Sequence, residues 1–193
     1  MQSLNSSNIV DFIGDIFARR GADSYLGEEV TMSEHMLQAA LLAEEETGDD
    51  LLIAAALLHD IGHYTNEFPE NALAEGINNH HDAAGAAVIA PYFPSLVVDC
   101  VQYHVDAKRY LCAVENDYFA QLSPASVHTL TLQGGPMAAA EVAEFASLEY
   151  LSAIVRVRRW DEGAKVAGKQ TPGFDYYADF LRRVLLEEQA LEH

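Results

Sequence analysis

The chain has 193 residues, half of them hydrophobic, and a formal net charge of −19. This length suffices for one domain with a sizeable core, and so negative a surface argues against partners such as nucleic acid or anionic membranes. No run of about 18 apolar residues predicts a transmembrane helix. The N-terminus lacks a signal-peptide pattern and the two cysteines form no CxxC motif, so we expect a cytoplasmic protein. Residues 1–190 are expected to form one domain, and 191–193 look like the remnant of a purification tag.

The apolar periodicity predicts helices along the whole chain. A first helix is expected over 7–20 and a second from about 33 to 48. The third, LLIAAALLHDIGH, follows Asp49 and Asp50 and is apolar on every side, as expected for a central buried helix. Strand signals are nearly absent, so the prediction is a single all-α domain, a helical bundle of about eight or nine helices. The remaining helices are expected at 81–90, 94–107, 124–132, 138–147, 148–160 and 175–190.

The spacing of the histidines gives the main functional signal. His59 and Asp60 end the very apolar third helix, where a buried carboxylate is costly unless it is paired or bound to a metal ion. The plain alternative is a salt bridge to Asp60. It is weakened because no Lys or Arg occurs between Arg20 and Lys108, although a distant arginine could still supply one. His63 follows His59 by four residues, a spacing that places two side chains on one helix face.

Ligands for one metal ion can be assembled around this doublet. His35 lies twenty-four residues before His59, and Asp161 in the segment VRRWDEGAK is the best candidate for an aspartate on a later helix. A lone histidine, a His-Asp doublet and a distant aspartate resemble the ligand set of the HD superfamily. Imidazole and carboxylate together suit iron, manganese or zinc. One ion would take His35, His59, Asp60 and Asp161.

Further histidines supply more ligands than one ion needs. Asp60 could bridge two ions with one oxygen to each, and His81 and His104 would then hold the second. Which member of the His80-His81 pair binds is open from spacing alone. We choose His81, because HDAAGAAVIA begins a helix there and places Gly85 for close packing. His80 is then a neighbour of the site, and its role is left open.

The chain resembles the HD-domain mixed-valent diiron oxygenases of phosphonate catabolism, a resemblance carried by the segments YLGEEVTMSEH, LLHDIGHY, HHDAAG, HVDAKRYL, LSPASVHTL, LQGGPM and RRWDEGAK. It extends from about Tyr25 to Lys165. Its most specific parts are Tyr25-x-x-Glu28, AKRYL and the stretch from Ser126 to Gln133-Gly-Gly-Pro. The most similar branch cleaves the C–P bond of (R)-1-hydroxy-2-(trimethylammonio)ethylphosphonate and yields glycine betaine and phosphate. A sister branch converts 2-amino-1-hydroxyethylphosphonate to glycine and phosphate.

The resemblance implies two iron ions in the mixed-valent Fe(II)/Fe(III) state, with O2 as co-substrate and a small hydroxyphosphonate as substrate. It implies that iron 1 is bound by His35, His59, Asp60 and Asp161. Iron 2 is implied to be bound by Asp60, His81 and His104.

The resemblance also implies roles around the substrate. Tyr25 would occupy iron 2 in the resting state and swing away when substrate arrives. Glu28 would accompany Tyr25 and then face the cationic end of the substrate. With His63, these two are the candidate catalytic residues. The phosphonate would be contacted mainly by His63, Lys108, Ser126 and Gln133.

The charge pattern supports one of these roles independently. Lys108 lies four residues after His104, one turn along the same helix face, and it is the first cation after the long gap. With Arg109 it could form a solvated basic pair, but the cation-free stretch before it argues against chance. A cation there could neutralise a phosphonate. A second basic cluster follows at Arg156, Arg158 and Arg159.

Other readings use the same residues. An HD-domain phosphohydrolase would use the same ligands to activate a water molecule. A metal-binding regulator without catalysis and an HD oxygenase that cleaves a polyol ring are two more. The oligomeric state is unknown from the sequence, as is whether Tyr64, Glu67 or Phe68 line the pocket.

Overall fold

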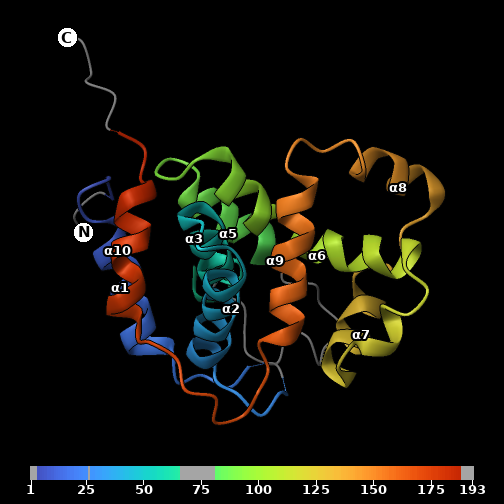
Figure 1. The fold of residues 1–193 in the computed structure, drawn as a ribbon, viewed down its shortest axis with the longest axis horizontal. Helices are drawn as coiled ribbons and strands as arrows, with labels where there is room; N and C mark the ends of the chain where they lie inside the picture. The colour runs from blue at the N-terminus through green and yellow to red at the C-terminus, as the bar shows by residue number, and fades with distance from the viewer. Residues whose placement is uncertain (1–3, 26, 66–80, 188–193) are drawn as a thin grey trace.

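The computed structural model describes residues 4–25, 27–65 and 81–187 (Figure 1). Within these residues, nine helices have seven residues or more, and the one extended pairing is an isolated bridge between Ser24 and Thr31. The all-α prediction is therefore confirmed. In chain order the helices are α1 (Ile9–Arg20), α2 (Met32–Thr47), α3 (Asp50–Leu58), α4 (Gly62–Thr65), α5 (His81–Ile89), α6 (Ser95–Val114), the short 3₁₀ helix η1 (Phe119–Gln121), α7 (Pro124–Leu132), α8 (Ala139–Phe145), α9 (Leu151–Gly163) and α10 (Phe174–Val184).

Side chains at the helix starts explain where α2 and α3 begin. Thr31 and Glu34 form a reciprocal capping box at the start of α2, with Oγ1 of Thr31 accepting from the backbone of Glu34 at 3.2 Å. Asp49 caps α3 by accepting from the backbone nitrogen of Leu51 at 2.8 Å. Between them Gly48 ends α2 with a φ of 62°, a conformation that glycine adopts without strain. The sharp turn between α2 and α3 therefore follows from local sequence.

Two helix boundaries differ from the prediction. The third helix was expected to include His63, but α3 ends at Leu58, and a turn carries His59 and Asp60 before α4 begins. The helix expected over 94–107 continues to Val114. Lys108 and Arg109 therefore lie inside α6, and Lys108 is buried. The remaining predicted helices are present, with ends that shift by a few residues.

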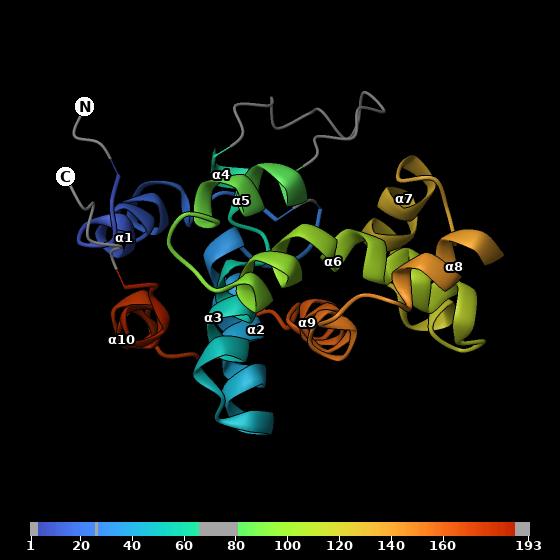
Figure 2. The same ribbon diagram turned by 90° about the horizontal axis from the view of Figure 1, so that it is seen from above.

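Helix α3 forms the centre of the core. Residues 53–58, IAAALL, are completely buried, and α3 packs against α2, α6, α9 and α10. The three alanines allow these neighbours to approach closely. Figures 1 and 2 show α1 and α10 at one end of the molecule and α7 and α8 at the other, with α2, α3 and α9 between them. None of the described helices is long and apolar enough to cross a membrane.

A contact between two glycines brings α5 against α4, which follows the turn after α3. A Cβ atom on Gly62 would lie 1.7 Å from the carbonyl oxygen of His81, and one on Gly85 would lie 2.9 Å from the nitrogen of Gly62. Only residues without a side chain permit this approach. The contact holds His81, the first residue of α5, beside Asp60, and it confirms the expectation that Gly85 serves close packing.

Replacing Gly62 with Ala should therefore separate α5 from the turn that carries Asp60. We expect the free energy of unfolding to fall by roughly 1–3 kcal/mol, as for other overpacked sites, when it is measured by urea denaturation. Gly173→Ala is the control, because a Cβ there meets no atom within 4 Å. An unfolding midpoint for Gly62→Ala equal to that of the unaltered protein would contradict the proposed packing.

Candidate metal centre

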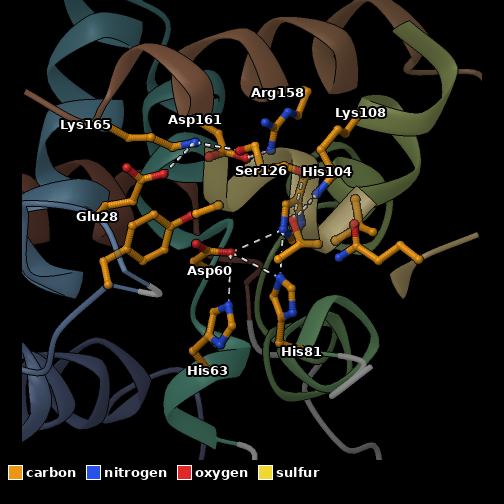
Figure 3. Close-up of a pocket in the computed structure, with 15 residues that line it drawn as sticks. Glu28, Asp60, His63, His81, His104, Lys108, Ser126, Arg158, Asp161 and Lys165 are labelled. Atoms are coloured by element: carbon orange, nitrogen blue, oxygen red, sulfur yellow. Dashed lines mark hydrogen bonds and ion pairs between the residues drawn. The ribbon is translucent and has the colours of Figure 1, made fainter. Parts of the chain in front are cut away.

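Five buried side chains converge from four parts of the chain. His35 comes from α2, His59 and Asp60 from the turn after α3, His81 from the start of α5 and His104 from the middle of α6. They form two groups that share Asp60, and within each group the possible ligand atoms lie within 4.8 Å of one another. Figure 3 shows Asp60 with dashed lines to His63, His81 and His104.

The two oxygens of Asp60 face different histidine pairs. Oδ2 lies 3.5 Å from Nε2 of both His35 and His59. Oδ1 lies 3.3 Å from Nε2 of His81 and 3.2 Å from Nε2 of His104. A carboxylate in this position can bridge two cations, one on each side, as the sequence suggested.

The hydrogen bonds of three histidines show which ring nitrogen faces the centre of the site. Nδ1 of His35, His59 and His104 lies 2.9, 2.7 and 2.8 Å from the carbonyl oxygens of Ala164, Ala56 and Val101. A carbonyl oxygen only accepts hydrogen bonds, so each Nδ1 carries a proton and each ring directs Nε2 inward. The Nε2 atoms of His35 and His59 are nevertheless only 3.0 Å apart. Two lone pairs this close require a cation between them, which is either a proton or a metal ion.

Asp161 extends the first group from α9. Its Oδ1 lies 3.4 Å from Nε2 of His35 and 3.9 Å from Nε2 of His59. Its Oδ2 accepts from the guanidinium of Arg158. Oδ1 of Asp161 and Oδ2 of Asp60 are buried and have no hydrogen-bond partner among the described residues. Such orphaned carboxylate oxygens beside converging imidazoles fit a bound metal ion.

The pKa shifts agree with an excess of negative charge at this centre. Burial lowers the pKa of His59, but the carboxylate of Asp60 outweighs it and raises that pKa to about 9. Burial raises the pKa of Asp161, but Arg158 outweighs it and holds that pKa well below the usual range. His63 differs, because burial and then the neighbouring His81 lower its pKa to about 3. Its ring stacks on that of His81 with centroids 3.9 Å apart.

A pocket lies directly beside the second histidine group, and His81 and His104 line it (Figure 3). Three cations line it, namely Lys108, Arg158 and Lys165. In a chain with only 11 Lys and Arg residues against 30 Asp and Glu, this concentration of positive charge indicates a site for an anion. All predicted substrate contacts line this pocket: Glu28, His63, Lys108, Ser126 and Gln133.

Lys108 is the buried basic side chain among the predicted contacts to the anion. It is 4% exposed, and its Nζ donates to Oγ1 of Thr129 at 2.7 Å. Burial and then the charge of Arg158 lower its pKa to about 7. Its neighbour Arg109 points elsewhere and binds Glu141 at 2.7 Å. The basic pair therefore consists of one pocket residue and one structural residue.

Arg158 and Lys165 line the pocket but were not predicted as site residues. Arg158 is 4% exposed and donates to Asp161, Glu162 and the hydroxyl of Tyr118. Helical spacing could have identified it, because Arg158 lies three residues before the predicted ligand Asp161 and shares its face. Lys165 lies just after the end of α9, four residues beyond Asp161.

Tyr25 and Glu28 lie in the pocket wall, as expected. The ring of Tyr25 stacks on His35, with centroids 3.9 Å apart and planes 15° apart. Burial, followed by the charges of Asp60 and Asp161, raises the pKa of its hydroxyl well above the usual value. Glu28 is tied to Tyr25 by a backbone hydrogen bond of 2.7 Å, and its Oε1 accepts from the hydroxyl of Ser123 at 2.5 Å.

Four residues whose roles the sequence left open follow the His59-Asp60 doublet. Tyr64 is buried in the core, with its ring 5.9 Å from that of Phe17, and it does not contribute to the described pocket wall. Ordinary packing therefore explains Tyr64. Glu67, Phe68 and His80 lie outside the described residues, as does the expected tag remnant at 191–193.

Comparison with known proteins places this site in a family. The HD domain pattern matches residues 32–131, from the start of α2 through α7. The chain belongs to the HD-domain family. It is 50% identical over 185 residues to the (1-hydroxy-2-(trimethylamino)ethyl)phosphonate dioxygenase (glycine-betaine-forming) of Leisingera caerulea, covering 96% of this chain and 94% of that protein. It is 45% identical over 173 residues to the hydroxymethylphosphonate dioxygenase of Gimesia maris, covering 88% and 82%. The resemblance expected from the motifs is confirmed.

The two groups around Asp60 predict about two metal ions per chain when metal content is measured by elemental analysis. His81→Ala should remove one ion, and Asp60→Ala should remove both because its carboxylate faces both groups. His80→Ala and the exposed His128→Ala should retain both ions. Loss of metal from His80→Ala, with full content in His81→Ala, would contradict the choice of His81.

Proposed function

We propose that this HD-domain protein is a cytoplasmic oxygenase. In this proposal it uses O2 to cleave the C–P bond of (R)-1-hydroxy-2-(trimethylammonio)ethylphosphonate and produces glycine betaine and phosphate. The observation that carries the proposal is the position of Asp60 between two histidine pairs, at the floor of a cation-lined pocket. Identity of 50% over nearly the full length to a protein named for that reaction supports the choice of substrate.

The proposed cofactors are two iron ions, one ferrous and one ferric. His35, His59, Asp60 and Asp161 would hold the first, and Asp60, His81 and His104 would hold the second. When bound, the irons would supply the redox chemistry that lets O2 oxidise the carbon bonded to phosphorus. The protein supplies fixed ligand geometry. Carbonyl groups of α3, α6 and the segment after α9 lock three of the imidazole rings in one tautomer.

The pocket residues would bind and orient the phosphonate. Lys108 supplies a buried positive charge, and Ser126 supplies a hydroxyl that already lies 2.9 Å from Nζ of Lys165. Gln133 lines the same wall, and the NH2 group of its side-chain amide would donate to a phosphonate oxygen. His63 lines the same wall and, with its pKa lowered, contributes a neutral imidazole. Charge-assisted hydrogen bonds from such groups fix an oxyanion in one orientation.

Tyr25 and Glu28 form the proposed gate. Tyr25 would be a resting-state ligand of the second iron and would leave when the substrate binds. Its ring packs on His35, so the residue lies at the metal centre before any substrate arrives. Glu28 would then face the cationic end of the substrate. Their backbone hydrogen bond couples the two movements.

The proposal is tested by supplying the iron-loaded enzyme with the trimethylated hydroxyphosphonate and measuring oxygen uptake and phosphate release together. We expect equal amounts of O2 consumed and phosphate released, and no phosphate in the absence of air. A preference for 2-amino-1-hydroxyethylphosphonate would assign the glycine-forming reaction instead. Phosphate release from nucleotides without oxygen would identify a phosphohydrolase, the alternative that uses the same ligands.

Burial of Lys108 predicts a characteristic pH dependence. Its pKa in the free enzyme is about 7, so the lysine is charged below that pH and becomes neutral as the pH rises. Lys108→Met should lower kcat/KM about tenfold near pH 6, the effect of one charge-assisted contact, and much less near pH 9. Lys169→Met, outside the pocket wall, is the control. If the ratio of kcat/KM between Lys108→Met and the unaltered enzyme stayed constant between pH 6 and pH 9, titration of Lys108 would be excluded.

A further inference from the structure

Glu28 is the one carboxylate of the described pocket wall that is not directed at the metal centre. Asp60 and Asp161 are the others, and both face the histidines. Glu28 lies instead at the N-terminus of α7, where the capping residue Ser123 donates to it at 2.5 Å. A negative charge near a helix N-terminus interacts favourably with the helix dipole. Glu28 is therefore held in a position where it can bind a cation.

That carboxylate already has a cation beside it. Nζ of Lys165 lies 3.8 Å from Oε1 of Glu28, and both side chains are nearly buried, at 10% and 15% exposure. Figure 3 shows the two side chains directed toward each other on one side of the pocket. A positive group of a substrate placed at Glu28 would therefore meet a resident ammonium of the same charge.

Lys165 has other partners that remain if a cationic group of the substrate replaces it beside Glu28. Its Nζ lies 3.1 Å from Oε2 of Glu162 and donates to Oγ of Ser126 at 2.9 Å. Glu162 itself accepts from Ser126 at 3.0 Å. Withdrawal of Lys165 from Glu28 therefore leaves the ammonium hydrogen-bonded and its charge paired, so the exchange of partners exposes no unpaired buried charge.

We infer that Lys165 is a specificity-determining residue that neutralises Glu28 in the free pocket and competes with the cationic group of the substrate for it. The inference rests on the proposed function and deepens it. A hydroxyphosphonate without a positive group leaves the Lys165–Glu28 pair intact. A hydroxyphosphonate with one must displace the ammonium or accept its repulsion. Lys165 thus reduces the difference in kcat/KM between hydroxyphosphonates with and without a positive group.

The test compares two hydroxyphosphonates on the iron-loaded enzyme. One carries the trimethylammonium group, and the other is hydroxymethylphosphonate, which carries no cation. Lys165→Met should raise the ratio of kcat/KM for the cationic over the uncharged compound about tenfold, because the competing charge is gone. Any general damage to the pocket, or a lost contact to the phosphonate, lowers both values together and leaves this ratio unchanged. Lys165→Arg retains the charge and should retain the ratio, and Lys169→Met should not change it.

The dissociation constants of both compounds, measured by calorimetry without oxygen, provide a second readout. Their ratio should shift in the same direction in Lys165→Met. An unchanged ratio, or one that favours the uncharged compound, would overturn the role assigned to Lys165. Failure of the unaltered enzyme to consume oxygen with either compound would instead overturn the proposed function, and the binding ratio would still decide the role of Lys165.

Discussion

The whole site depends on one buried carboxylate. Asp60 is 2% exposed and lies among histidine nitrogens at 3.2–3.5 Å, and its Oδ2 has no hydrogen-bond partner among the described residues. A charge in such a place is tolerated only if cations surround it. Three further helices supply the surrounding histidines, and the glycine contact between α4 and α5 allows one of them to come close. The bundle is therefore organised around a charge that the core could not otherwise accommodate.

The same constraint extends outward through α9. Asp161 adds a second buried carboxylate, and Arg158 balances it while also binding Glu162. Glu162 in turn holds Ser126 and Lys165 at the pocket wall. One turn of helix therefore links the metal centre to the anion pocket, so the two cannot be positioned independently. This coupling fixes the positions of Ser126 and Lys165 in the pocket wall.

Several features could be predicted from the sequence because they depend on local patterns. The apolar third helix, its aspartate cap and the His-Asp doublet depend on neighbouring residues, and a short run of small residues was enough to favour His81. The roles within the basic cluster depend on tertiary packing instead. Arg156 and Arg159 pair with Glu46 and Glu115 at the surface, whereas Arg158 is buried. Helix α6 continues past the predicted end at residue 107, and Lys108 donates to the hydroxyl of Thr129 on α7, a contact set by tertiary packing.

The placement of positive charge affects how an anion reaches the pocket. The pocket cations Lys108, Arg158 and Lys165 are all at most 10% exposed, while the chain as a whole carries a net charge of −19. At low ionic strength an approaching anion is repelled until it nears the mouth, since the field of the surface reaches further than that of the buried cations. Dissolved salt shortens that reach to about 10 Å at 0.1 M. Salt therefore accelerates the encounter of this protein with anions, the opposite of its effect on an electrostatically steered association.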